Sequence, residues 1–140
     1  MARQTQAARP QTETSMQMAV VRWARKAAEE WPGFEALRWL FHTANEGKVD
    51  PREAGKRQSM GVLAGVSDLL LLARSGRYSG LCLELKRKPN RLSAEQRAFL
   101  DFAAAQGYKA AVAYSVEEAQ AVITSYLQGQ NQDERGGFNR

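Results

Sequence analysis

The stretch V-S-D-L-L-L-L-A-R-S-G-R-Y-S-G-L-C-L-E-L-K-R, residues 66–87, decides the fold of this chain. We predict a strand over 66–73, and its unbroken apolar run at 69–72 is typical of a strand buried on both faces in the middle of a sheet. Residues 74–80 hold two glycines and two serines, which favour a hairpin turn. The chain returns as a second strand over 81–87, so the two strands are predicted to be antiparallel neighbours.

Three charged residues interrupt these apolar strands. Glu84 and Lys86 lie two apart, so they share one face of their strand, while Leu83 and Leu85 point the other way into the core. Asp68 lies near the start of the neighbouring strand. Two carboxylates beside an ammonium group suit a divalent cation such as Mg²⁺. The spacing by itself favours a buried ionic network that satisfies only itself.

Outward from this hairpin, periodicity and capping residues predict the remaining elements. A helix running to about Glu30 begins at a capping box of Thr14 and Gln17, and a basic helix spans 51–60. Further predictions are a strand at 37–43, a polar loop around 45–47, a helix from the Ser93 and Gln96 capping box to Gly107, a strand at 108–114, and a last helix opened by Ser115 and Glu118. This order predicts an α/β fold: a single domain with a central mixed β-sheet flanked by helices.

The ends of the chain differ from its body. With 140 residues, of which 44% are hydrophobic and 25% charged, the chain fits one domain. We assign residues 1–12 and 128–140 to flexible polar tails and 13–127 to the domain. No apolar stretch approaches the roughly 20 residues of a bilayer span, and no signal-peptide core is visible. A cytoplasmic protein, in a bacterial or phage-infected cell, is therefore expected, with neither a membrane nor secretion involved.

Positive charge is concentrated in the middle of the chain. The net charge is +5, and residues 48–97 hold eleven Lys or Arg against five Asp or Glu. A polyanion such as DNA is the partner that this distribution favours, although a solvated basic face has the same composition. The candidate phosphate contacts form two clusters on either side of the charged strands: Arg52, Lys56 and Arg57, and Arg87, Lys88 and Arg91.

Several stretches together resemble the VRR-NUC domain, a branch of the PD-(D/E)XK nuclease superfamily, over 13–127. They are Glu13 with Gln17, F-H-T-A-N-E-G at 41–47, M-G-V-L-A-G-V-S-D-L at 60–69, G-L-C-L-E-L-K at 80–86, and L-S-A-E-Q at 92–96. The resemblance implies a restriction-endonuclease-like core. It also implies Asp68, Glu84 and the carbonyl of Leu85 as metal ligands, with Lys86 as the catalytic lysine.

The resemblance also assigns flanking roles. Glu13 and Gln96 match active-site positions of the family, and Ser67 stands where the family usually has a proline that would stiffen the approach to Asp68. Each flanking residue has a plainer reading, because Gln96 can cap its own helix at Ser93 and Glu13 can interact with a helix dipole.

Three other polar residues are left out of the chemistry. His42 is interpreted as a hydrogen-bonded packing residue, Asn45 as a turn residue and Cys82 as a small, inert core residue. As the only cysteine and the only histidine, Cys82 and His42 also exclude a zinc cluster.

The function predicted from these residues is that of a Mg²⁺- or Mn²⁺-dependent, structure-specific DNA endonuclease. By analogy with compact members of the family, we expect branched DNA such as Holliday junctions, cut by a homodimer. The alternatives are a flap, nicking or replication-fork nuclease of a virus or mobile element, a non-catalytic DNA-binding module on a nuclease fold, and a structural protein that shares only the fold.

Overall fold

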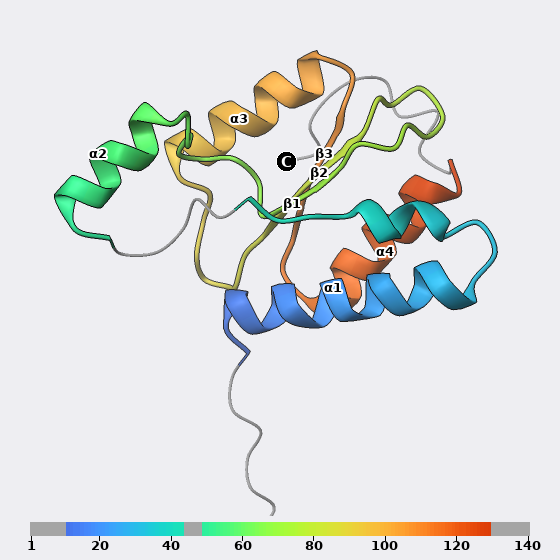
Figure 1. Cartoon of the computed structure of the whole chain (residues 1–140). Helices are drawn as coiled ribbons and strands as arrows, with labels where there is room; N and C mark the ends of the chain where they lie inside the picture. Colours follow the sequence, from blue (N-terminus) through green and yellow to red (C-terminus); the bar gives the residue numbers. More distant parts are fainter. Residues whose placement is uncertain (1–10, 44–48, 130–140) are drawn as a thin grey trace, which may run out of the picture.

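The computed structural model describes residues 11–43 and 49–129 (Figure 1). In the described part of the chain, the elements follow the order α1 (Glu13–Glu30), a 3-10 helix η1 (Glu35–Trp39), α2 (Pro51–Ser59), β1 (Leu69–Leu71), β2 (Leu81–Leu85), α3 (Ala94–Ala105), β3 (Lys109–Ala113) and α4 (Val116–Leu127). The predicted α/β domain with a mixed sheet between helices is confirmed. The predicted tails at 1–12 and 128–140 and the loop around 45–47 fall largely outside the described residues.

The sheet has the strand order β1-β2-β3 in the described residues. β1 pairs antiparallel with β2, with Leu69 opposite Leu83, and β2 pairs parallel with β3. The predicted antiparallel hairpin is therefore confirmed. Its first strand was predicted in the middle of the sheet, and that prediction is wrong, because β1 is at the edge of the described sheet. β2 is central, with all five residues buried, whereas β1 is three residues long and Leu72 beyond it is 68% exposed.

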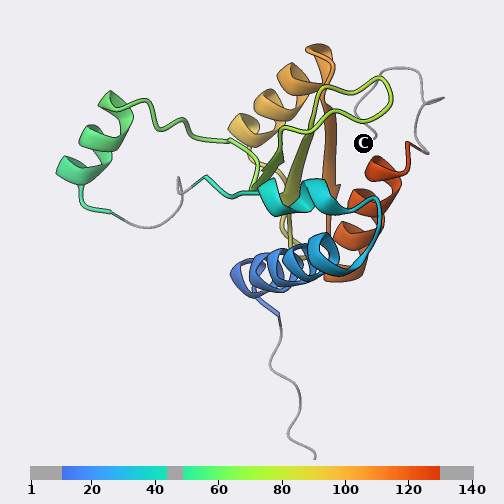
Figure 2. The same ribbon diagram turned by 45° about the vertical axis from the view of Figure 1, so that its right-hand side comes forward.

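Helices cover the two faces of the sheet unequally. Helices α1 and α4 lie together on one face, and α3 lies on the other (Figures 1 and 2). The α1 and α4 face holds the larger core, in which the odd-numbered leucines of β1 and β2 meet apolar residues of both helices. The α3 face holds a smaller cluster around Cys82, Leu100, Ala103 and Ala110.

The predicted strand at 37–43 is wrong for most of its length. Residues 35–39 form η1, and only Phe41 makes a single antiparallel bridge, with Leu70. Leu37 and Leu40 are both buried, and a three-residue spacing suits the three-residue turn of a 3-10 helix. The guanidinium of Arg25 donates hydrogen bonds to the carbonyls of Leu37 and Leu40. This long-range contact, which local periodicity does not contain, holds the turn in place.

Two of the three predicted capping boxes differ in detail. α1 is capped by Thr12 and Ser15 rather than Thr14 and Gln17. α3 has the predicted box of Ser93 and Gln96. Ser115 caps α4 by accepting from the amide of Glu118, but the carboxylate of Glu118 accepts from the amide of Tyr114.

Gly65 fixes the approach of the chain to Asp68. Its φ is +90°, and an added Cβ would lie 2.5 Å from the backbone carbonyl carbon of Glu95 in the first turn of α3. Gly61 has a similar φ of +94°, yet an added Cβ there would meet nothing within 4 Å. A comparison of the two glycines therefore separates the effect of a positive φ from the effect of close packing against α3.

We predict that Gly65→Ala destabilises the protein more than Gly61→Ala. The positive φ costs each alanine about 1 kcal/mol, and the clash with Glu95 adds roughly 1–3 kcal/mol at position 65. Urea unfolding of both variants measures the difference. Equal losses of stability would mean that the contact between Gly65 and α3 does not hold this loop.

Candidate active site

The register of the hairpin brings the two candidate metal ligands together. Leu69 lies opposite Leu83, so Asp68 and Glu84 are the next facing positions beyond the end of β1. Directly opposed residues point to the same face of an antiparallel pair. The two side chains are 5% and 1% exposed, respectively, so a pair of like charges is buried at one end of the sheet.

Backbone amides hold these carboxylates in place. The amide of Leu85 donates to Oδ2 of Asp68 at 2.8 Å, and the amide of Asp68 donates to Oε2 of Glu84 at 3.3 Å. The N–H and C=O of one strand residue point to the same side, so the carbonyl of Leu85 is also directed toward the strand that carries Asp68. The three predicted ligand groups are thus neighbours.

The electrostatics of the pair favour a bound cation. Burial and, after it, the charge of Asp68 raise the pKa of Glu84 to about 8, although the positive charge of Lys86 opposes both effects. A carboxyl group with this pKa keeps its proton at neutral pH unless positive charge replaces it. A divalent cation between Asp68 and Glu84 would supply that charge.

Lys86 directly follows the end of β2 and lies on the same face as Glu84. Its amide donates to the carbonyl of Ala113, which extends the pairing with β3, and the residue is 9% exposed. Among the described residues, Lys86 forms no ion pair with either carboxylate. Its positive charge nevertheless lowers the pKa of Glu84, so Lys86 lies near the pair without an ion pair to it in the described residues, which suits a group that acts on a ligand.

Gln96 combines the two roles considered for it. Its Oε1 accepts from the amide of Ser93 at 2.9 Å as a helix cap, while its Nε2 donates to Oε1 of Glu84 at 3.0 Å. The capping box therefore orients the side chain that contacts the candidate ligand. Helix α3 is positioned against the site by this contact.

Glu13 reaches the same end of the sheet from α1. Its Oε1 accepts from the amide of Arg87 and from Nδ2 of Asn90, both at 3.1 Å. Glu13 thus contacts the residue that follows Lys86. The structure brings all five predicted catalytic side chains into one region: Glu13, Asp68, Glu84, Lys86 and Gln96.

His42 contacts the site, and the sequence did not predict this contact. Its Nδ1 lies 2.6 Å from the backbone carbonyl of Asp68, and since a carbonyl only accepts, Nδ1 carries the proton. The interpretation as a hydrogen-bonded residue fits, but its partner is the backbone of a candidate ligand. The two residues are 26 positions apart, so no local sequence pattern predicts this hydrogen bond.

The surroundings of Ser67 and Cys82 indicate structural roles for both residues. Ser67 is fully buried, and its hydroxyl donates to the carbonyl of Leu69 at 3.3 Å, which gives the approach to Asp68 a hydrogen bond of its own. Burial raises the pKa of the Cys82 thiol to about 11, so a reactive thiolate is not formed near neutral pH.

The two basic clusters lie in different surroundings. Arg87, Lys88 and Arg91 are exposed and follow the strand that carries Glu84 and Lys86. Arg52, Lys56 and Arg57 lie on α2, which has no buried residue and stands apart from the body of the domain (Figures 1 and 2). Arg57 pairs with Glu53 at 3.5 Å. Asn45, interpreted as a turn residue, lies outside the described residues.

The donor set fits a hard divalent cation. Residues 11–43 and 49–129 contain no group of three or more His, Cys, Asp or Glu side chains able to hold a metal ion. Two carboxylates and a carbonyl remain, an all-oxygen set of the kind that binds Mg²⁺ or Mn²⁺ with water and phosphate oxygens. The fit rests on the buried like-charge pair.

No helix in the described ranges is long and apolar enough to cross a membrane.

Comparisons with known proteins agree with this geometry. The family model described as the VRR-NUC domain matches residues 2–117. A solved structure described as a VRR_NUC domain protein is 27% identical, covers 86% of this chain and 91% of its own, and superposes with a TM-score of 0.71. No curated protein matched the chain. The chain therefore belongs to the VRR-NUC domain family, which implies a nuclease-type function in DNA processing.

Proposed function

We propose that this protein is a Mg²⁺- or Mn²⁺-dependent endonuclease that hydrolyses phosphodiester bonds in branched DNA, such as Holliday junctions, as a homodimer. The observation that carries the proposal is the buried pair of facing carboxylates, Asp68 and Glu84, beside Lys86, which forms no ion pair among the described residues. A purely structural ionic network would bring Lys86 into contact with one of the carboxylates. Lys86 makes no such ion pair with the residues that the structure describes, so its charge can serve a bound phosphate or water.

Asp68, Glu84 and the carbonyl of Leu85 would hold the cation. When bound, Mg²⁺ or Mn²⁺ supplies Lewis acidity that activates water and offsets charge on the phosphate. Lys86 orients the attacking water or donates to a phosphate oxygen, where its charge stabilises the transition state. Gln96 fixes the rotamer of Glu84 through Nε2, and Glu13 fixes the chain at Arg87 beside the catalytic lysine.

The preference for branched DNA rests on symmetry. A four-way junction has two equivalent strands to cut, which one active site in each subunit of a homodimer would match. A flap, nicking or replication-fork nuclease would use the same catalytic residues. A DNA-binding module without catalysis is less favoured, because it gives no reason to keep two carboxylates buried against each other.

We predict metal-dependent cleavage that needs Lys86. End-labelled four-way junction, flap, nicked and linear DNA are incubated with Mg²⁺, Mn²⁺ or chelator. Symmetric incision of the junction is expected only with metal, and Lys86→Ala should reduce the single-turnover rate by about a hundredfold or more. Lys26→Ala, which removes an exposed lysine of α1, is the matched control and should cut at the wild-type rate.

The outcomes separate the candidate functions. Metal-dependent cutting of flaps or linear duplex, without a junction preference, would keep the nuclease and discard the junction substrate. Tight binding to DNA with no cutting of any substrate would contradict the endonuclease and favour the binding module. Full activity of Lys86→Ala would remove the lysine from the mechanism.

We predict that metal affinity rises with pH. The pKa of Glu84 is about 8, so below that pH the cation must displace a proton, and the apparent affinity should fall about tenfold for each unit of pH. Above about pH 8 it should level off. Calorimetric titration with Mn²⁺ measures this, and Glu84→Gln should bind weakly with little dependence on pH. An affinity that is flat below pH 8 would contradict a proton shared with the metal site.

We also predict that α2 binds phosphates of the DNA. Arg52 and Lys56 lie four residues apart on one face of α2 and are exposed. Replacing both with alanine should lower the slope of log Kd against log salt by roughly 2, because each cation that neutralises a phosphate contributes about 1 to the slope. Junction binding is measured by anisotropy in chelator, with Lys26→Ala as the control. An unchanged slope would place α2 away from the DNA.

A further inference from the structure

The backbone of Asp68 has a hydrogen bond to which the proposed reaction assigns no role. Nδ1 of His42 donates to the carbonyl oxygen of Asp68 at 2.6 Å. The other polar groups of Asp68 bond within the hairpin, because its amide donates to the carboxylate of Glu84 and its own carboxylate accepts from the amide of Leu85. His42 thus holds Asp68 from outside the hairpin.

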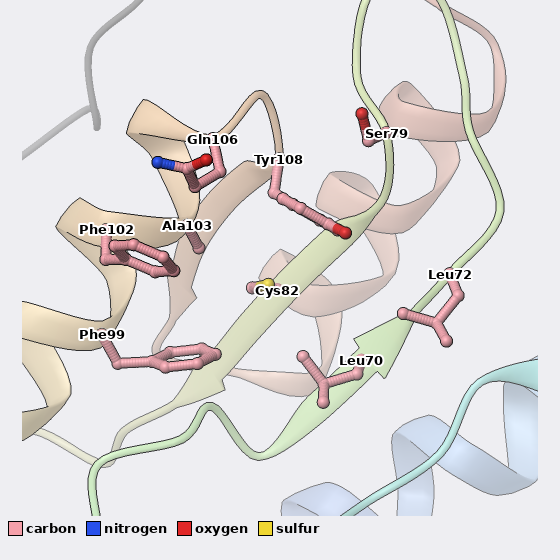
Figure 3. Close-up of a pocket in the computed structure, with 9 residues that line it drawn as sticks. All are labelled: Leu70, Leu72, Ser79, Cys82, Phe99, Phe102, Ala103, Gln106 and Tyr108. Carbon is pink, nitrogen blue, oxygen red and sulfur yellow. The ribbon is translucent and has the colours of Figure 1, made fainter.

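The direction of the Asp68 carbonyl follows from the sheet. Leu70 of β1 lines a pocket beside α3 (Figure 3), and side chains two positions apart share a face, so the carboxylate of Asp68 lies on the α3 face as well. Backbone groups lie in the plane of the sheet instead. Those of Leu70 bond with Phe41, at 2.9 and 3.0 Å, on the side of β1 away from β2. The carbonyl of Asp68 points to this same edge.

The imidazole of His42 takes the place of the next hydrogen bond of this edge pairing. Phe41 is opposite Leu70, so continuation of the register would set Thr43 opposite Asp68, with the amide of Thr43 donating to the Asp68 carbonyl. Within 11–43 and 49–129, no backbone amide donates to that carbonyl, and Nδ1 of His42 does so. A side chain, which a substitution can remove, therefore completes the pairing of a candidate metal ligand.

The surroundings of His42 allow this hydrogen bond to be tested without emptying the core. His42 is half-buried and lines an open groove of about 400 Å³, together with Phe41 and residues of α1. A smaller side chain at position 42 therefore enlarges a groove that solvent already reaches, and it leaves no sealed cavity that would cost packing energy. The contact with Asp68, more than packing, is what the imidazole contributes.

We propose that His42 is a positioning residue, which holds the carbonyl of Asp68 and thereby sets the carboxylate of Asp68 against Leu85 and Glu84. The side chain of aspartate is short, so a shift of its backbone carbonyl moves the carboxylate as well. The inference rests on the assignment of Asp68 as a metal ligand in the proposed function. It adds a residue that acts on the metal site through Asp68 and does not itself touch the metal.

Hydrogen exchange of two consecutive amides in the metal-free protein tests the proposal. The amide of Leu85 donates to the carboxylate of Asp68, whereas the amide of Lys86 donates to the carbonyl of Ala113 in β3. In His42→Ala, exchange followed by NMR should be about tenfold faster at Leu85 and unchanged within about twofold at Lys86. Equal acceleration of both amides would mean a general loss of stability and would overturn the proposal, as would unchanged exchange at Leu85.

Two further variants separate the hydrogen bond from the ring. The side-chain nitrogen of asparagine can lie where Nδ1 of histidine lies, whereas that of glutamine reaches further, toward the position of Nε2. His42→Asn should therefore restore the protection of the Leu85 amide to within about threefold of the wild type, and His42→Gln should behave like His42→Ala. Equal protection in the asparagine and glutamine variants would contradict a role for the donor at Nδ1.

Binding of Mn²⁺ alone, measured by calorimetry, links the position of Asp68 to the metal site. The Kd should rise about tenfold or more in His42→Ala and stay close to the wild-type value in His42→Asn. Ser75→Ala is the matched control, because it also removes a side-chain donor to a backbone carbonyl, that of Tyr126, in the turn at the other end of β1. It should bind Mn²⁺ like the wild type.

The calorimetric outcomes distinguish the positioning role from the proposed function. An unchanged Kd in His42→Ala, or an equal rise in Ser75→Ala, would overturn the positioning role. A wild type that binds no Mn²⁺, while exchange at Leu85 responds to His42→Ala as expected, would overturn the metal site of the proposed function and leave the hold of His42 on Asp68 standing.

Discussion

Burial of two facing carboxylates is the constraint on which the site depends. Asp68 and Glu84 repel each other, and loss of water raises the cost of charging either one. The fold tolerates the pair because backbone amides and Gln96 hold the oxygen atoms, and because Lys86 adds positive charge nearby. The residue before β1 and residues of α1, β2 and α3 meet at this end of the sheet, so packing of the whole domain maintains the repulsion between the two carboxylates.

Much of this arrangement is contained in local sequence. The hairpin at 66–87 has strong turn residues, and the alternation of side chains along its second strand places Glu84 and Lys86 on one face. The capping box of Ser93 and Gln96 predicts the start of α3. The assignment of Asp68 and Glu84 as ligands needed the resemblance to a nuclease family, because charged residues at this spacing in a strand by themselves favour a structural network. Once the register is known, their opposition follows from the hairpin alone.

The errors arose where distant contacts decide local structure. Residues 37–43 have the composition of a strand, but hydrogen bonds from Arg25 to the carbonyls of Leu37 and Leu40 favour a 3-10 turn. The leucines at 69–72 resemble a central strand, yet β1 is at the edge of the described sheet: Leu69 and Leu71 are buried in the core, whereas Leu72 is 68% exposed. The contact of His42 with Asp68 likewise joins segments whose spacing carries no periodic signal.

The three-residue length of β1 has a consequence for how firmly the carboxylate pair is held. Asp68 depends on the attachment of this short edge strand, which is held on one side by β2 and on the other by the single bridge to Phe41. A local opening that releases β1 separates Asp68 from Glu84, while the pairing of β2 with β3 and much of the packing of α1 and α4 persist. The geometry of the carboxylate pair can therefore be lost through the fraying of one strand without global unfolding.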